Sequence, residues 1–112
     1  MKHWTIQEAR DRYNIIPWGA GYFDINSQGH LVAHLKNQNA IQSVDLFELV
    51  GKLKAQGLTA PILVRFPDIL HNRIDNLNQS FVDAMNRHHY LGRYTAVYPI
   101  KVNQQYSVVK EI

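Results

Sequence analysis

Lys101 is the residue of this sequence best placed to carry out chemistry. It directly follows residues 94–100, an apolar run typical of a buried strand. In α/β folds, sites gather at the carboxyl ends of such strands. Strand alternation predicts one shared face for Val97, Pro99, Lys101 and Asn103. At a barrel mouth the lysine would be partly desolvated, which favours the neutral amine that Schiff-base chemistry requires. Spacing alone, however, favours an ordinary solvated lysine at a strand end.

Three further polar residues have two interpretations each. Asn103 could belong to the same site, or it could satisfy backbone groups at a turn from strand to helix. Arg65 could face a barrel mouth, although an outward position among helices is favoured. His71 could line the cofactor side of a site, although a capping or solvent-facing role near the start of a helix is favoured.

The histidines do not predict a metal site. His30 and His34 have the spacing H-x₃-H, but on a strand they lie about 13 Å apart because each residue rises about 3.3 Å. One zinc ion cannot reach both. His88 and His89 are adjacent and face different directions on a helix. The sequence has no cysteine, which excludes disulfides and thiolate ligands and fits a reducing cytosol.

The first part of the chain predicts a helix and a hairpin. Thr5 and Glu8 form a capping box, so a short helix is expected to about residue 13, ending before Pro17. Two stretches that alternate in polarity flank a turn with a glycine and predict antiparallel strands. The expected strands are residues 22–26 and 31–35, the turn is 27–29, and a polar loop follows at 36–42.

The second part predicts alternating helices and strands. Ser43 is expected to cap a helix over residues 44–56 that Gly57 ends. Asp68 is expected to cap a long amphipathic helix that reaches about residue 90 and is ended by Gly92. Buried strands are predicted before and after this long helix, and a further helix after the second strand. These are residues 61–67, residues 94–100 and residues from 105 onward.

A strand, a helix and a second strand make one βαβ unit. Two parallel strands alone leave their outer edges unpaired, because parallel sheets need many strands with helices on both faces. The predicted fold class is therefore α/β, with a helix and β-hairpin that lead into the first βαβ unit of a truncated (β/α)₈ barrel of about 250 residues. We divide the chain into residues 1–42, the start of a β-domain, and 43–112, the first barrel elements, and expect the natural protein to continue past Ile112.

Composition and charge indicate which classes of function we expect for the chain. Hydrophobic residues make up 46% and charged residues 19%, which is ordinary for a folded globular domain. The net charge of +3 is scattered, so the chain lacks the basic stripe of a nucleic-acid-binding protein. No apolar window is long enough to predict a membrane span, and no signal peptide is visible at the start. We therefore expect a cytoplasmic protein that binds neither nucleic acid nor membrane.

The segment around Lys101 resembles a known signature. Residues 98–103, Tyr-Pro-Ile-Lys-Val-Asn, with the aliphatic Val108, Val109 and Ile112 downstream, are similar to the cofactor-lysine motif of group IV (fold type III) decarboxylases. These enzymes act on ornithine, diaminopimelate or arginine. Residues 18–26, 45–50 and 61–70 resemble the opening of the biosynthetic arginine decarboxylases, which the other two branches lack.

The resemblance implies a lyase that uses pyridoxal 5′-phosphate (PLP) and, in this branch, Mg²⁺. In such a homo-oligomeric enzyme Lys101 would hold PLP as a Schiff base, with Asn103 nearby, and L-arginine would be decarboxylated to agmatine for polyamine biosynthesis. The groups that hold the phosphate, the pyridine nitrogen and the guanidinium lie downstream in the family. We therefore expect the 112-residue piece alone to be inactive and to associate through its exposed strands.

Two alternatives stay open from sequence. The chain could be a non-catalytic interaction or scaffold domain that retains the motif, or part of a decarboxylase of ornithine or diaminopimelate. Continuation of the reading frame into a glycine-rich phosphate loop and acidic pocket residues would favour an enzyme. A natural stop codon after Ile112 would favour the scaffold.

Overall fold

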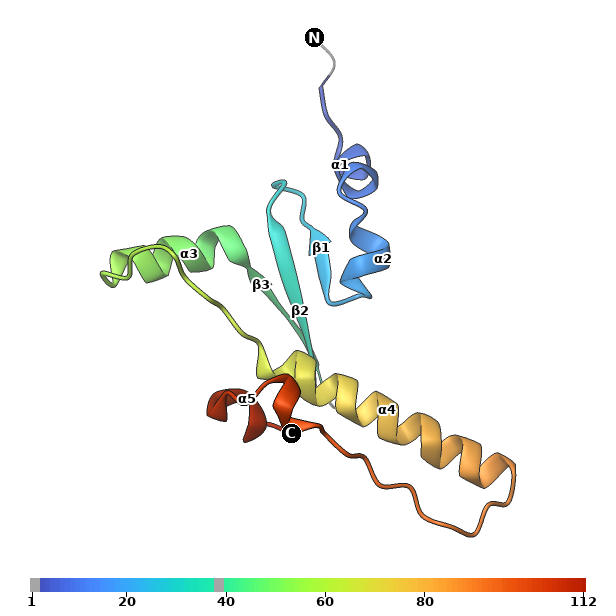
Figure 1. The fold of residues 1–112 in the computed structure, drawn as a ribbon. Coiled ribbons are helices and arrows are strands. Elements are labelled where there is room, and N and C mark those ends of the chain that lie inside the picture. Colours follow the sequence, from blue (N-terminus) through green and yellow to red (C-terminus); the bar gives the residue numbers. More distant parts are fainter. Residues whose placement is uncertain (1–2, 38–39) are drawn as a thin grey trace. The chain divides into compact units, whose positions relative to one another are not determined.

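The computed structural model describes residues 3–37 and 40–112, which fall into two compact units, Met1–Arg65 and Phe66–Ile112 (Figure 1). The first unit holds helices α1 to α3 and a three-stranded sheet, and the second holds helices α4 and α5. Residues 42 and 43 are neighbours within one strand, and the first unit continues to Arg65. The assignment of the two parts to a β-domain and a barrel stays a prediction.

Helix α1, Ile6–Arg12, begins with the predicted capping box. The backbone N–H of Glu8 donates to Thr5 Oγ1 at 3.1 Å, and the N–H of Thr5 donates to Glu8 Oε2 at 3.0 Å. A second helix, α2, Ile15–Gly19, follows and was not predicted. Pro17 lies in its first turn, where a missing N–H removes no internal hydrogen bond. The proline therefore lies inside the first turn of a helix here instead of only ending one.

The sheet has the antiparallel order β1-β2-β3 and confirms the predicted hairpin. Its strands are β1, Phe23–Ile25, β2, Leu31–Asn37, and β3, Ala40–Asp45. The predicted loop over 36–42 is wrong, because Lys36 pairs with Ile41 and Leu35 pairs with Gln42 in the ladder; residues 38 and 39 lie outside the described part. Backbone groups form these bonds, so polar side chains do not prevent a strand at an exposed position.

Helix α3, Leu46–Ala55, begins later than predicted. Ser43 and Val44 belong to β3, and the cap is Asp45, whose Oδ1 accepts the N–H groups of Phe47 at 2.9 Å and Glu48 at 3.1 Å. Ser43 cannot serve as the cap because its backbone is held in the ladder opposite His34. The predicted stop at Gly57 is confirmed by its φ of 89° and the bond from its N–H to the Lys54 carbonyl at 2.9 Å.

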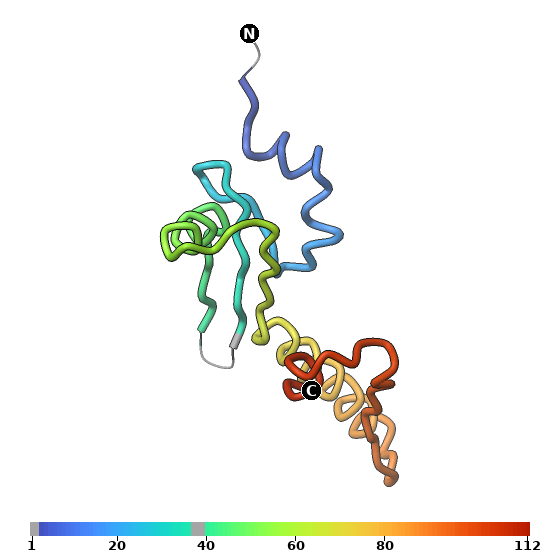
Figure 2. Tube along the Cα trace, turned by 60° about the vertical axis from the view of Figure 1, so that its left-hand side comes forward, coloured from blue at the N-terminus to red at the C-terminus, as the bar shows by residue number. Residues whose placement is uncertain are grey.

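The buried apolar residues of the described chain all belong to the first unit. Val32 and Ala33 lie at the centre of the sheet on β2, and they are joined by Ile15 of α2, Tyr22 before β1 and Ile25 of β1. The sheet, the short helix α2 and the residues between them thus build one small core. Figure 2 shows the N-terminal helical segment beside the sheet strands.

Helix α4, Pro67–Arg87, is the long predicted helix of the second unit, with different ends. Phe66 occupies the cap position without a side-chain bond and Pro67 is the first helical residue, so Asp68 lies within the first turn and does not cap it. At the other end His89 adopts a φ of 53°, and the N–H of Tyr90 donates to the Met85 carbonyl at 2.9 Å. This hydrogen-bonded reversal ends the helix before Gly92 is reached.

The two predicted parallel strands are absent from the described residues, so the predicted βαβ unit is wrong for this structure. Residues 61–66 are irregular, and the segment before Lys101 is unpaired until a 3₁₀ turn, η1, Ile100–Val102, and helix α5, Tyr106–Val109. The apolar runs are present but uncovered: Leu63 is 74% exposed and Val97 82%. A parallel strand depends on neighbours for its hydrogen bonds and its apolar contacts. The barrel stays a prediction.

Helices long and apolar enough to cross a membrane do not occur in the described ranges.

Candidate functional site

Lys101 lies in the middle of η1, between the extended segment that returns along α4 and the start of α5 (Figure 1). The turn is closed by the N–H of Val102, which donates to the Pro99 carbonyl at 2.9 Å. Because this turn interrupts the extended backbone, the alternation that placed Val97, Pro99 and Lys101 on one face does not continue to the lysine. A single helical turn, not a strand, presents the amine.

The turn is anchored on its far side through Asn103. The Tyr98 hydroxyl donates to the Asn103 carbonyl at 3.1 Å, and Asn103 Oδ1 accepts the N–H of Gln105 at 3.0 Å. These bonds join the residue before the turn to the residue that caps α5. Of its two predicted roles, Asn103 takes the one that satisfies backbone groups at the entry to a helix. Contact with a cofactor stays a prediction.

The Lys101 side chain is exposed and makes no hydrogen bond or ion pair with other described residues. An amine in this setting is open to an incoming carbonyl compound, because no carboxylate must first be displaced. The turn itself supplies a defined backbone for the lysine. The partial desolvation expected for a lysine at a barrel mouth is not found, because the Lys101 side chain is exposed. Schiff-base formation at Lys101 stays a prediction.

The two other predicted candidates have separate surroundings. His71 lies within the second turn of α4, where its Nε2 is 3.1 Å from Glu111 Oε2, so it caps no helix. Arg65 is exposed and belongs to the first unit, whereas Lys101 belongs to the second. A role for Arg65 at the mouth of a site stays a prediction.

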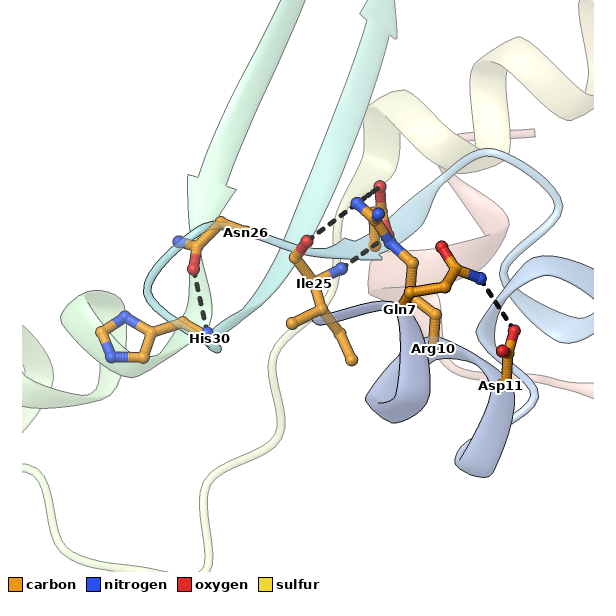
Figure 3. A network of polar contacts seen from close by, with 7 residues as sticks. Gln7, Arg10, Asp11, Ile25, Asn26 and His30 are labelled. Carbon is orange, nitrogen blue, oxygen red and sulfur yellow. Dashed lines mark hydrogen bonds and ion pairs between the residues drawn. The ribbon is translucent and has the colours of Figure 1, made fainter. Parts of the chain in front are cut away.

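A polar network that the sequence did not predict joins the hairpin turn to α3. Asp45 Oδ2 accepts from Asn26 Nδ2 at 2.8 Å and lies 2.8 Å from His30 Nδ1. Asn26 Oδ1 also accepts the N–H of His30 at 2.9 Å, the bond that Figure 3 shows between these two residues. The His30 ring also packs on Phe47, with ring centroids 4.6 Å apart. One carboxylate thus caps a helix and fixes a turn of the hairpin.

The charge of Asp45 is favoured by these donors. Desolvation raises its pKa, but the N–H of Glu48 and the hydrogen bonds from His30 and Asn26 outweigh it, so the pKa of Asp45 lies below its ordinary value. The one sequence signal for this role was an aspartate directly before an apolar helical repeat, a position where Ser43 competed as an equally good cap.

A second unpredicted contact fastens α1 to β1. Arg10 donates from Nε to Asp24 Oδ1 at 2.6 Å and from Nη2 to Asp24 Oδ2 at 2.8 Å and the Ile25 carbonyl at 3.1 Å (Figure 3). The hydrogen bond from Arg10 lowers the pKa of Asp24, against the effect of desolvation, and the same bond raises the pKa of Arg10. This forked pairing is structural, because both partners are already occupied by each other.

The histidine of β2 is also engaged in a local contact. His34 Nδ1 lies 2.8 Å from Ser43 Oγ on the neighbouring strand. Within residues 3–37 and 40–112, no three His, Cys, Asp or Glu side chains gather where they could hold a metal ion. We therefore assign no metal ligand in this part of the chain.

The first unit also has a largely apolar surface hollow of about 380 Å³. Its lining comes from α2 and the hairpin together with the residue after α1: Tyr13, Ile15, Trp18, Ile25, Gly29 and Leu31. None of these side chains carries a charge. Apart from the Tyr13 phenol, the lining therefore has no group suited to acid–base or nucleophilic chemistry, and the lysine turn remains the candidate site.

Comparison with known proteins finds relatives along almost the whole chain. Curated proteins named biosynthetic arginine decarboxylase match along almost the whole chain: one from Pseudomonas aeruginosa is 47% identical over 110 residues, one from Gloeobacter violaceus is 46% identical over 112, and one from Prochlorococcus marinus is 40% identical over 111. These matches cover 98%, 100% and 99% of this chain, respectively. No family model matches, and no solved structure matches.

The chain spans about one sixth of the length of these relatives, 17% of each. The predicted resemblance is therefore confirmed: along its whole length this chain is homologous to part of the biosynthetic arginine decarboxylases.

Proposed function

We propose that this chain forms the lysine-bearing part of a PLP-dependent arginine decarboxylase, in which Lys101 binds the cofactor covalently. The observation that carries the proposal is an exposed lysine without a polar partner in the described chain, on a turn anchored by Tyr98 and Asn103, in a sequence homologous to proteins named biosynthetic arginine decarboxylase. The proposed activity, decarboxylation of arginine, is taken from the name of the relatives. Lys101 on the turn is the residue proposed to bind the cofactor for it.

The fit of this part of the chain to PLP rests on Lys101. Its exposed amine can reach an aldehyde, and the turn holds its backbone while the side chain stays free to move. When bound, PLP supplies an electron sink for the loss of carbon dioxide from an amino acid. Asn103 stabilises the turn by accepting a hydrogen bond from the backbone N–H of Gln105. We assign neither a phosphate ligand nor a Mg²⁺ ligand among the described residues.

L-Arginine is the proposed substrate, and agmatine formed for polyamine biosynthesis the product. The decarboxylation of arginine is taken from the name of the relatives, which cover this chain from end to end, and the polyamine pathway is taken from the family resemblance. The same resemblance implies that the residues that select arginine over ornithine or diaminopimelate lie outside this chain. A homo-oligomeric enzyme in the cytoplasm is part of the same proposal.

The test is chemical mapping of the lysine in the intact protein. Borohydride reduction in the presence of PLP, followed by peptide mapping, should label the peptide that contains Lys101. Lys101→Ala should abolish the label and lower the decarboxylation of arginine by at least about 10³-fold, because no neighbouring group can replace the amine. Lys54→Ala is the control, since Lys54 is also an exposed lysine but lies on α3 in the other unit, and it should retain label and activity.

Three outcomes would contradict the proposal. Label on Lys52, Lys54 or Lys110 in place of Lys101 would refute the lysine assignment. Faster release of carbon dioxide from ornithine or diaminopimelate would refute the substrate. No label and no activity in an intact protein of the relatives' length would favour the scaffold alternative.

A further inference from the structure

The segment that carries Lys101 is fastened to α4 at two points, one on each side of the lysine. Before it, the Tyr94 ring stacks on Phe81 with centroids 3.9 Å apart and planes inclined by 8°. After it, Glu111 Oε2 lies 3.1 Å from His71 Nε2. The two attachment residues on α4 are ten positions apart, about 15 Å along the helix axis. Lys101 lies in the chain between the two attachments.

The attachment at His71 joins parts of the chain that are far apart in sequence. His71 and Glu111 are separated by 40 residues, and Figures 1 and 2 both show α5 beside the N-terminal end of α4. The second carboxylate oxygen of Glu111 lies 3.3 Å from Lys110 Nζ, so both oxygens face cations or donors. The Glu111 side chain is 25% exposed, compared with 49% for His71.

We propose that His71 and Glu111 are positioning residues for Lys101: their contact holds α5, and through it the far end of the lysine turn, against the first turns of α4. This inference rests on the proposed function of Lys101 and goes beyond it, because neither residue touches the lysine. The chain of contacts runs from His71 to Glu111, along α5 to Gln105, and through Asn103 to Tyr98 on the other side of the turn. Loss of the contact frees one end of the turn.

The first measurement is hydrogen exchange in the intact protein, with peptides that separate residues 98–110 from α4. His71→Ala and Glu111→Ala should each speed the exchange of residues 98–110 by about two- to five-fold, the range expected for loss of an exposed ion pair. The double variant should show no larger increase than either single one, because both substitutions remove the same contact. His71→Gln keeps a side-chain N–H donor and should restore most of the protection.

Gln79→Ala is the matched control. Gln79 lies on the same helix and donates to Asp83 at 2.7 Å, within one turn of α4. It removes an exposed polar contact of the same helix without touching α5, so exchange over residues 98–110 should not change. Equal acceleration in this control would overturn the proposal.

The second measurement separates positioning from binding. In the decarboxylase assay, His71→Ala and Glu111→Ala should lower kcat by about two- to five-fold while KM for arginine stays the same, because the contact acts on the lysine turn and not on the substrate. Unchanged exchange in either alanine variant, additive increases in the double variant, or a change in KM alone would overturn the proposal. If the protein does not decarboxylate arginine, the exchange result still decides whether the contact holds the turn, so the two proposals fail separately.

Discussion

The two units of this chain are stabilised in different ways. In Met1–Arg65, three strands pair with one another around Val32 and Ala33, and polar side chains such as Asp45 and Asp24 have partners within the unit. In Phe66–Ile112, the described residues include no buried side chain, and the apolar residues of the lysine segment are exposed. The unit that bears the candidate site is thus the one that completes less of its own core.

The first unit completes itself because its strands are antiparallel. Antiparallel strands are joined by short turns, so the hairpin and β3 satisfy one another within about twenty residues of chain. The predicted strand of the second unit, residues 94–100, would be parallel, and a parallel strand needs crossovers and further strands at its edges. We interpret the exposed Val97 as part of an apolar run that such further strands would cover, and the barrel stays a prediction.

The largest effect is expected at the centre of the first unit. Ala33 is fully buried on the central strand, so Ala33→Asp places a carboxylate where no partner is available. We expect a loss of about 3 kcal/mol or more in the free energy of unfolding, measured by urea titration of the 112-residue chain.

The matched change in the second unit is Val97→Asp. In the 112-residue chain it should shift the urea midpoint little, because the side chain is already exposed. In the intact protein the same substitution should destabilise as strongly as Ala33→Asp, if the rest of the protein covers Val97. An equally small shift of the urea midpoint in the 112-residue chain and in the intact protein would show that the lysine segment stays exposed and that the barrel prediction is wrong.

A smaller effect is expected for the cap of α3. Asp45→Ala removes the side-chain acceptor of two backbone N–H groups and the partner of His30 and Asn26, so the melting temperature of the 112-residue chain should fall by about 4–8 °C. Ser43→Ala, which removes only the contact with His34, should shift it by less than about 2 °C. A larger fall in melting temperature for Ser43→Ala than for Asp45→Ala would favour Ser43 as the cap of the helix, as predicted from sequence.

The smallest effect concerns pH. The pKa values of Asp24 and Asp45 are lowered in the folded chain, so the unfolded state binds more protons between the folded values and the ordinary value of about 3.9. The stabilisation from these carboxylates is complete above about pH 5 and is lost as pH falls through the folded pKa values. Asp24→Asn should reduce the slope of melting temperature against pH below about pH 4. A slope that is unchanged in this variant would show that the contact with Arg10 does not stabilise the fold.

Local signals predicted the beginning and end of several elements. The capping box of α1, the hairpin with its glycine turn and the stop of α3 at Gly57 each depend on hydrogen bonds between residues close in sequence, and the structure confirms them. The predicted loop over 36–42 and the cap at Ser43 were wrong for one shared reason. Residues of both segments take part in the pairing of β2 with β3. Strand pairing is made by backbone groups, so the polarity of the side chains does not predict it.

The candidate site divides in the same way. The position of Lys101 after an apolar run drew attention to it, although spacing alone favoured an ordinary solvated lysine. The resemblance to arginine decarboxylases made it the candidate, and that resemblance was readable from the sequence because it is carried by residue identity. Only the tertiary structure placed Lys101 on a 3₁₀ turn, turned Asn103 toward Gln105 and brought Glu111 to His71 across 40 residues. Those contacts depend on how the chain reverses its direction after α4. The reversal takes place at His89, which has a positive φ, and not at Gly92. The order of residues alone does not determine which of these two positions adopts the left-handed conformation.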